Sequence, residues 1–178
     1  MPNWCSNILI VRGDKKLIKK FKRKAKGKDT DLSLDNFVPM PKEFEKFSSP
    51  VRIVSEEEYK KAIKEKEKGN PRFQYGLPMT KEIQKKLLEK YGCDNWYDWC
   101  VENWGTKWDV EAELVDESEI YLRYEFDSAW SPPIDWLEEV AKQFPKLHFK
   151  LKYEEEGMGF MGIAIGENGE VIDKYLEY

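Results

Sequence analysis

The sequence predicts an α+β fold whose strands and helices follow the order β-α-β-β-α-β, with one more hairpin at the end. Two observations support this prediction. An early segment is rich in β-branched residues, and apolar residues alternate with polar ones in most segments after residue 106, both of which are typical of strands. Between these strands, apolar residues recur every three or four positions, which is typical of helices. This order of elements defines the ferredoxin-like arrangement.

The first strand is expected over residues 6–12, SNILIVR, because β-branched residues dominate this segment. Both of its faces are apolar, so we expect a central strand that is covered on both sides. Asp14 is the expected N-cap of the helix that follows, and Gly27 is expected to end it.

A helical insertion is predicted over residues 29–104, between the first helix and the second strand. It begins with an irregular loop that contains several prolines. A charged helix is expected at 56–68, and a second helix at 80–91 with Thr80 as its N-cap. A third, short helix is expected to start at Asp94.

The period then changes from 3.6 to 2, which predicts two half-buried strands of a hairpin at 107–115 and 119–127. Ile120 is expected on the inward face of the second of these strands. The helix that follows is expected to have Ser131 as its cap and Pro132 at its first position.

The C-terminal part is expected to form a strand at 147–153 and a hairpin that turns through Asn168 and Gly169. The predicted order of the strands across the sheet is 6-5-4-1-3-2. The whole chain, residues 1–178, is thus predicted to be a single ferredoxin-like domain with a helical insertion.

In an antiparallel sheet of this order, four unusual segments meet at one end: MPNWCSN, NWGTKWD, DSAWSPP and YEEEGMGF. Four of the seven tryptophans lie in them. Two interpretations remain open: these side chains close the core and satisfy loop N–H groups, or they line a cleft with convergent polar groups. The candidate ligand-binding residues are Asn3, Trp4, Asn103, Trp104, Thr106, Lys107, Asp109, Trp130 and Glu154.

The same segments resemble the YubB ferredoxin-like family of bacterial plasmids and phages. The resemblance rests on MPNWCSN, FVPMP at 37–41, WYDWCVENWGTKWD at 96–109, SAWSPP at 128–133 and YEEEGMGFMG, and it runs nearly from end to end. It implies a ferredoxin-like fold and an association with mobile elements. It supplies no catalytic residues, because the family has no established biochemical function.

The first helix suggests an alternative function. Nine of the fourteen residues from Lys15 to Lys28 are Lys or Arg, and none is acidic. Such a face is either solvated surface or a site for phosphate groups of a nucleic acid. The nucleic-acid-binding candidates are Lys15, Lys16, Lys19, Lys20 and Arg23.

A small hydrolase or metal-dependent enzyme is a further alternative, with Lys107 beside the carboxylates of Asp109, Asp127 and Glu154. The sequence contains no nucleophile elbow and no glycine-rich phosphate loop. Its single histidine, His148, is expected on the polar face of a strand. We therefore favour a non-enzymatic binding or accessory protein without a metal or cofactor.

Composition limits the partners. The net charge of −4 gives no general attraction to nucleic acid, although residues 1–28 carry ten basic side chains and one acidic one. The odd number of cysteines, three, is typical of a reducing compartment. No signal peptide precedes the first strand and no apolar stretch approaches 18 residues. We expect a cytoplasmic protein whose partner is a protein or a nucleic acid and not a membrane.

Overall fold

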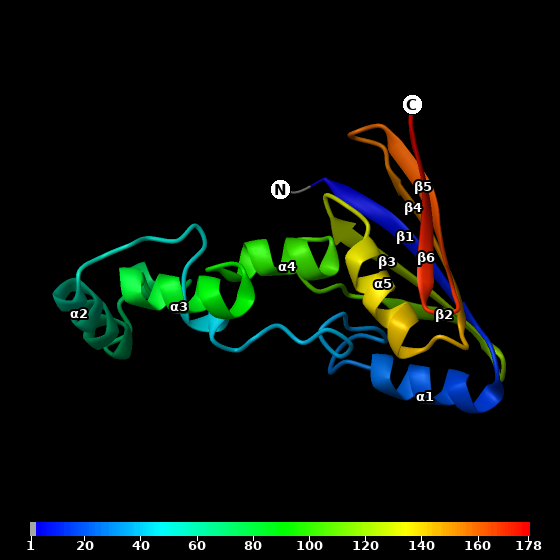
Figure 1. Ribbon diagram of the computed structural model, residues 1–178, viewed down its shortest axis with the longest axis horizontal. Helices are drawn as coiled ribbons and strands as arrows, with labels where there is room; N and C mark the ends of the chain where they lie inside the picture. Colours follow the sequence, from blue (N-terminus) through cyan, green and yellow to red (C-terminus); the bar gives the residue numbers. More distant parts are fainter. Residues whose placement is uncertain (1–2) are drawn as a thin grey trace. The chain divides into compact units, whose positions relative to one another are not determined.

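The computed structural model describes residues 3–178, whose contacts form two compact units (Figure 1). The first unit contains residues 3–39 and 101–178, and the second contains residues 40–100. Met1 and Pro2 of the MPNWCSN segment lie outside the described residues.

The first unit is built on a six-stranded antiparallel sheet with the order β2-β3-β1-β4-β5-β6, which confirms the predicted order. β2 pairs with β3, and β4, β5 and β6 pair in their order along the chain, while β1 lies between β3 and β4. The strands are β1 (Trp4–Arg12), β2 (Glu113–Ser118), β3 (Tyr121–Ala129), β4 (His148–Glu155), β5 (Phe160–Glu167) and β6 (Glu170–Glu177).

Two helices, α1 (Lys15–Ala25) and α5 (Ile134–Gln143), lie on the same face of this sheet (Figure 1). Asp14 caps α1 as predicted, since its carboxylate accepts a hydrogen bond from the Lys16 N–H. The prediction that Ser131 caps α5 is wrong. Its hydroxyl donates to the carbonyl of Gly105, and α5 begins after Pro133 without a side-chain cap.

The core lies between the sheet and these two helices. Leu9 and Val11 of β1 are fully buried there, but Ile8 and Ile10 on the other face are only half-buried. The prediction that β1 is covered on both sides is therefore wrong, because α1 and α5 share one face. Large, fully buried side chains of this core include Phe21, Tyr124, Trp136, Leu137, Phe149 and Leu151. Burying a side chain of this size stabilises the fold by about 1.5–3 kcal/mol.

The second strand starts later than predicted. Residues 107–112 pair with a loop rather than with β3: the Ala112 N–H donates to the Thr30 hydroxyl, and the Ala112 carbonyl accepts from the Asp31 N–H. Only from Glu113 onward does the chain join the sheet. Ile120, expected inward, is 61% exposed because it lies in the turn between β2 and β3.

The last hairpin turns where the sequence predicts. Asn168 and Gly169 both have positive φ angles, of 54° and 84°, which a two-residue hairpin turn of type I′ requires. The turn places β6 at one edge of the sheet, with β2 at the other.

The second unit contains helices α2 (Glu56–Glu67) and α3 (Lys81–Tyr91), the short 3-10 helices η1 (Phe44–Lys46) and η2 (Pro71–Phe73), and the first residues of α4 (Trp96–Trp104). Thr80 caps α3 as predicted. For α4, the side chain of Asn95, not Asp94, accepts from the Asp98 N–H. That residues 1–178 form one domain with an insertion at 29–104 stays a prediction.

Among residues 3–178, no helix is long and apolar enough to cross a membrane.

Candidate functional site

The segments that the sequence predicts to meet do meet at one end of the sheet. Trp4 lies opposite Ala129 in the β1–β3 pair, and the Trp130 N–H donates to the Asn3 carbonyl over 3.0 Å. The rings of Trp4 and Trp108 lie with their centroids 6.3 Å apart. Antiparallel pairing thus gathers side chains from the chain start, the NWGTKWD segment and the end of β3.

Two of the candidate residues are buried and hold this end of the sheet together. The Trp104 side chain is 3% exposed, and its Nε1–H donates to the Val38 carbonyl over 2.8 Å. The Thr106 side chain is 1% exposed, and its hydroxyl donates to the Ala129 carbonyl over 2.9 Å. Both side chains use their polar groups to fix neighbouring backbone.

Asp109 also has a structural task. Its carboxylate accepts hydrogen bonds from the Ser33 hydroxyl and the Leu34 N–H, both over 2.6 Å, and from the Val110 N–H over 2.8 Å. A longer bond of 3.4 Å comes from the Asp35 N–H. The carboxylate therefore ties residues 33–35 to the segment that leads into β2.

Other candidate residues remain at the surface. Trp4 and Trp130 are 49% and 50% exposed, and the Nζ of Lys107 lies 4.4 Å from the ring centroid of Trp108. Glu154 accepts a hydrogen bond from the Tyr178 hydroxyl. Asn103 is half-buried in α4.

Trp130 has a strained backbone. Its φ angle is 77°, in the left-handed region that a bulky side chain rarely adopts. Strain of this kind persists where surrounding structure enforces it, and it is common at binding sites. Here the Asn3 carbonyl holds the Trp130 N–H and so keeps the half-exposed indole at the end of the sheet.

A cavity of about 390 Å³ opens at this end, and its lining combines aromatic rings with carboxylates: Trp4, Trp108, Asp109, Glu111 and Asp127. It shares Glu111 and Asp127 with a groove of about 580 Å³ along the sheet face that lies opposite α1 and α5. The charged residues of the groove are Glu111, Glu113, Glu125, Asp127, Lys152 and Glu154. Carboxylates thus outnumber amines in the lining, and their field favours cations.

Sequence reasoning did not place Trp108, Glu111 and Glu125 among the candidate residues. The acids on the polar face of the two predicted hairpin strands were a signal that could have found the groove. Trp108 and Glu111 line one cavity because residues 107–112 do not follow a regular strand, so alternation does not keep them on opposite faces.

Within residues 3–178, no three His, Cys, Asp or Glu side chains are placed to hold a metal ion together. The acidic run at the end of β4 serves a turn instead. Glu155 is 2% exposed, and its carboxylate accepts from the Gly157 and Met158 N–H groups over 2.9 and 2.6 Å. The catalytic alternative also needs Asp109, whose carboxylate is engaged with the loop described above.

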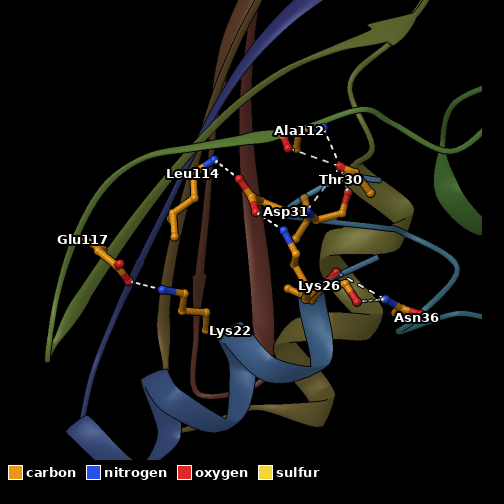
Figure 2. Close-up of polar contacts among 10 residues, drawn as sticks. Lys22, Lys26, Thr30, Asp31, Asn36, Ala112, Leu114 and Glu117 are labelled. Atoms are coloured by element: carbon orange, nitrogen blue, oxygen red, sulfur yellow. Dashed lines mark hydrogen bonds and ion pairs between the residues drawn. The ribbon is translucent and has the colours of Figure 1, made fainter. Parts of the chain in front are cut away.

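The basic helix is partly neutralised. Lys15, Lys22 and Lys26 of the α1 region form ion pairs with Glu119, Glu117 and Asp31, and Figure 2 shows the last two pairs. Glu117 and Glu119 belong to the β2–β3 hairpin, and Asp31, in the loop after α1, accepts a hydrogen bond from the Leu114 N–H of β2, so these pairs also tie α1 to the edge of the sheet.

The remaining candidate residues for nucleic-acid binding do not take part in these ion pairs. The Nζ of Lys20 lies 5.7 Å from the ring centroid of Phe144. Lys16, Lys19 and Arg23 have no ion-pair partner among the described residues. The structure therefore offers a phosphate fewer unpaired cations than the sequence suggests.

An antiparallel sheet in this strand order, with two helices on one face, belongs to the ferredoxin-like α+β class. Comparison with protein families agrees: residues 103–178 match the model described as "Ferredoxin-like domain in Api92-like protein". Among solved structures, the chain is similar to the crystal structure of the protein api92 from Yersinia pseudotuberculosis. The two chains are 12% identical with a TM-score of 0.54, and the match covers 100% of this chain and 98% of that one.

At this identity the structural likeness establishes the fold alone. Together with the family match it confirms the predicted fold class and the resemblance to a ferredoxin-like family. The narrower YubB assignment stays a prediction. Comparison with curated proteins gave no match.

Proposed function

We propose that the protein is a non-enzymatic binding module that holds a cationic side chain of a protein partner at the tryptophan end of its sheet. The observation that carries this proposal is the lining of one cavity by two indole rings and by carboxylates. An ammonium or guanidinium group is attracted both by the face of an indole and by a carboxylate. The chemistry of this cavity is therefore that of a cation receptor.

The two rings have a suitable arrangement. Trp4 and Trp108 are inclined to each other by 53° with centroids 6.3 Å apart, so they form two walls and not a closed stack. The protein's own Lys107 already places its ammonium 4.4 Å from the Trp108 centroid. The ring of Trp108 is thus positioned to interact with a positive charge.

The groove next to the cavity also favours cations, and it can accommodate a longer segment of the partner. Its lining carries five carboxylates and one amine, from Lys152. Arg123 pairs with Glu125 and weakens that part of the field, whereas Asp127 accepts from the neutral Ser6 hydroxyl. A segment rich in Lys or Arg complements such a surface, and this complementarity accelerates association and selects the partner.

The same proposal includes the cellular location of the protein and its association with mobile elements. The motifs shared with the YubB family support an accessory protein of plasmids or phages, and the three cysteines support a cytoplasmic location. We also propose that residues 1–178 act as one ferredoxin-like domain, with the insertion at 29–104 as its helical part. The ion pairs of α1 and the engaged Asp109 make nucleic-acid binding and hydrolysis weaker alternatives.

The test is a titration of the protein with hexalysine at low salt, with binding measured by calorimetry. Hexalysine with acetylated side chains serves as the uncharged control. We expect only the charged peptide to bind, and we expect Trp4→Leu and Asp127→Asn each to weaken binding about fivefold or more. Glu138→Gln removes an exposed acid of α5 that does not line the groove, and it should leave the affinity unchanged.

Two results would overturn the proposal. One is the absence of hexalysine binding at low salt. The other is a loss of affinity in Glu138→Gln that equals the loss in Trp4→Leu and Asp127→Asn, because it would show attraction to net charge and not to this cavity.

A further inference from the structure

A second concave region lies between α1 and the β2–β3 hairpin, away from the tryptophans. It consists of two cavities, of about 530 and 290 Å³, which both have Lys19 and Lys22 in their lining. We call this region the α1 trough. Cavities of this size accommodate small ligands.

The α1 trough has an apolar interior. Leu114 and Tyr124 line the larger cavity, and Ile18 and Leu122 line the smaller one. The walls include the stems of basic side chains, whose methylene groups cover apolar surface while their charged ends reach water. Glu117 and Glu119 also line the smaller cavity, where they form ion pairs with Lys22 and Lys15. An apolar body can therefore lie inside while an anionic group remains among the charges at the rim.

Tyr124, which lines the larger cavity, carries an unsatisfied polar group. Tyr124 is 0% exposed, and its hydroxyl has no hydrogen-bond partner among the described residues. Burial, and after it the nearby Asp31 and Glu117 carboxylates, raise the pKa of this phenol well above its usual value. The hydroxyl is thus a protonated donor, and buried donors are nearly always bonded.

The rim supplies cations. Lys19 and Arg23 line the larger cavity and have no ion-pair partner among the described residues. Asp31 is an acid in the same lining. Its carboxylate is occupied, because it pairs with Lys26 over 2.6 Å and accepts from the Leu114 N–H over 2.9 Å (Figure 2).

We propose that the α1 trough binds a small carboxylic acid with an apolar tail. The carboxylate lies between Lys19 and Arg23 and accepts a hydrogen bond from the buried Tyr124 hydroxyl, while the tail lies along Leu114, Leu122 and Ile18. This site is independent of the acidic groove, with which it shares no lining residue. Each proposal can therefore fail without the other.

Three probes test the proposal by calorimetry on the full chain: sodium octanoate, 1-octanol and inorganic phosphate. Octanoate has both the charge and the tail, octanol lacks the charge, and phosphate lacks the tail. We expect octanoate to bind at least about tenfold more tightly than either, since each lacks one of the two interactions.

Variants locate the binding. Tyr124→Phe keeps the ring and removes only the hydroxyl, and we expect about 3- to 10-fold weaker octanoate binding from the lost hydrogen bond. A Lys19→Gln/Arg23→Gln double variant changes only rim residues and should weaken binding more than about tenfold. Lys16→Gln, on the same helix but outside the trough lining, should leave octanoate affinity unchanged.

Phosphate binding as tight as octanoate binding would overturn the proposal in favour of a general anion site. Unchanged octanoate affinity in both Tyr124→Phe and the double variant would overturn it as well, and so would the absence of octanoate binding at millimolar concentration.

Discussion

Replacing Asp109 by alanine is expected to destabilise the first unit strongly. Three hydrogen bonds of 2.6–2.8 Å end on this carboxylate, from Ser33, Leu34 and Val110. A hydrogen bond to a charged group contributes about 1.5–3 kcal/mol, and freed N–H groups at a loop regain part of this from water. We therefore expect a loss of about 3 kcal/mol or more in the free energy of unfolding. In a chain of this length, that loss lowers the thermal midpoint by roughly 6–12 °C.

The assay is differential scanning calorimetry of Asp109→Ala beside Glu111→Ala. Glu111 is exposed, lies two positions along the chain, and its side chain forms no ion pair within the part of the chain that the structure describes. Removal of an exposed side chain of this kind usually changes stability by less than about 0.5 kcal/mol. Equal midpoints for the two variants would refute the view that Asp109 is structural and would return it to the list of candidate binding residues.

Three further predictions concern other parts of the first unit. Since Trp130 has a φ of 77°, Trp130→Gly should unfold at a higher temperature than Trp130→Ala, by a difference of about 1 kcal/mol in stability; the reverse order would contradict the strain. Hydrogen bonding to Lys26, and then to the Leu114 N–H, lowers the pKa of Asp31 below its ordinary 3.8. The stabilisation is therefore present above pH 3.8 and is lost as the pH falls through the lowered value, so urea titrations should show the gap between wild type and Asp31→Asn narrowing in acid. A gap that stays constant would count against the ion pair. Burial raises the pKa of Cys5 to about 12, and Cys93 and Cys100 are buried too. Ellman's reagent at pH 7 should thus react with three thiols only after unfolding, and rapid reaction of the native protein would contradict the structure.

Much of the fold could be predicted because the local signals agree with the tertiary structure. The alternation in β3 and β4, the cap at Thr80 and the Asn168-Gly169 turn each depend on a few neighbouring residues. The errors arise where contacts with residues distant in the sequence determine the local structure. The backbone at Ala112 bonds to Thr30, 82 residues away, so the predicted strand begins late.

The candidate site could be predicted only as a meeting of segments. Strand order determines which ends share an edge, and that order follows from the sequence of elements. It does not show that Thr106 turns inward to the Ala129 carbonyl while Trp4 and Trp130 remain half-exposed. The α1 trough is less visible still, because nothing local marks Tyr124 as a residue whose hydroxyl lacks a partner.

The central claim is that Trp4 and Trp108 receive a cation. The seven indole N–H groups provide separate reporters in a ¹H–¹⁵N correlation spectrum of the protein titrated with hexalysine. Our account predicts progressive, saturable shifts of the Trp4 and Trp108 indole signals, while the buried Trp104 and Trp136 signals stay in place. Saturation without movement of the Trp4 and Trp108 signals would place the bound peptide elsewhere and contradict the claim.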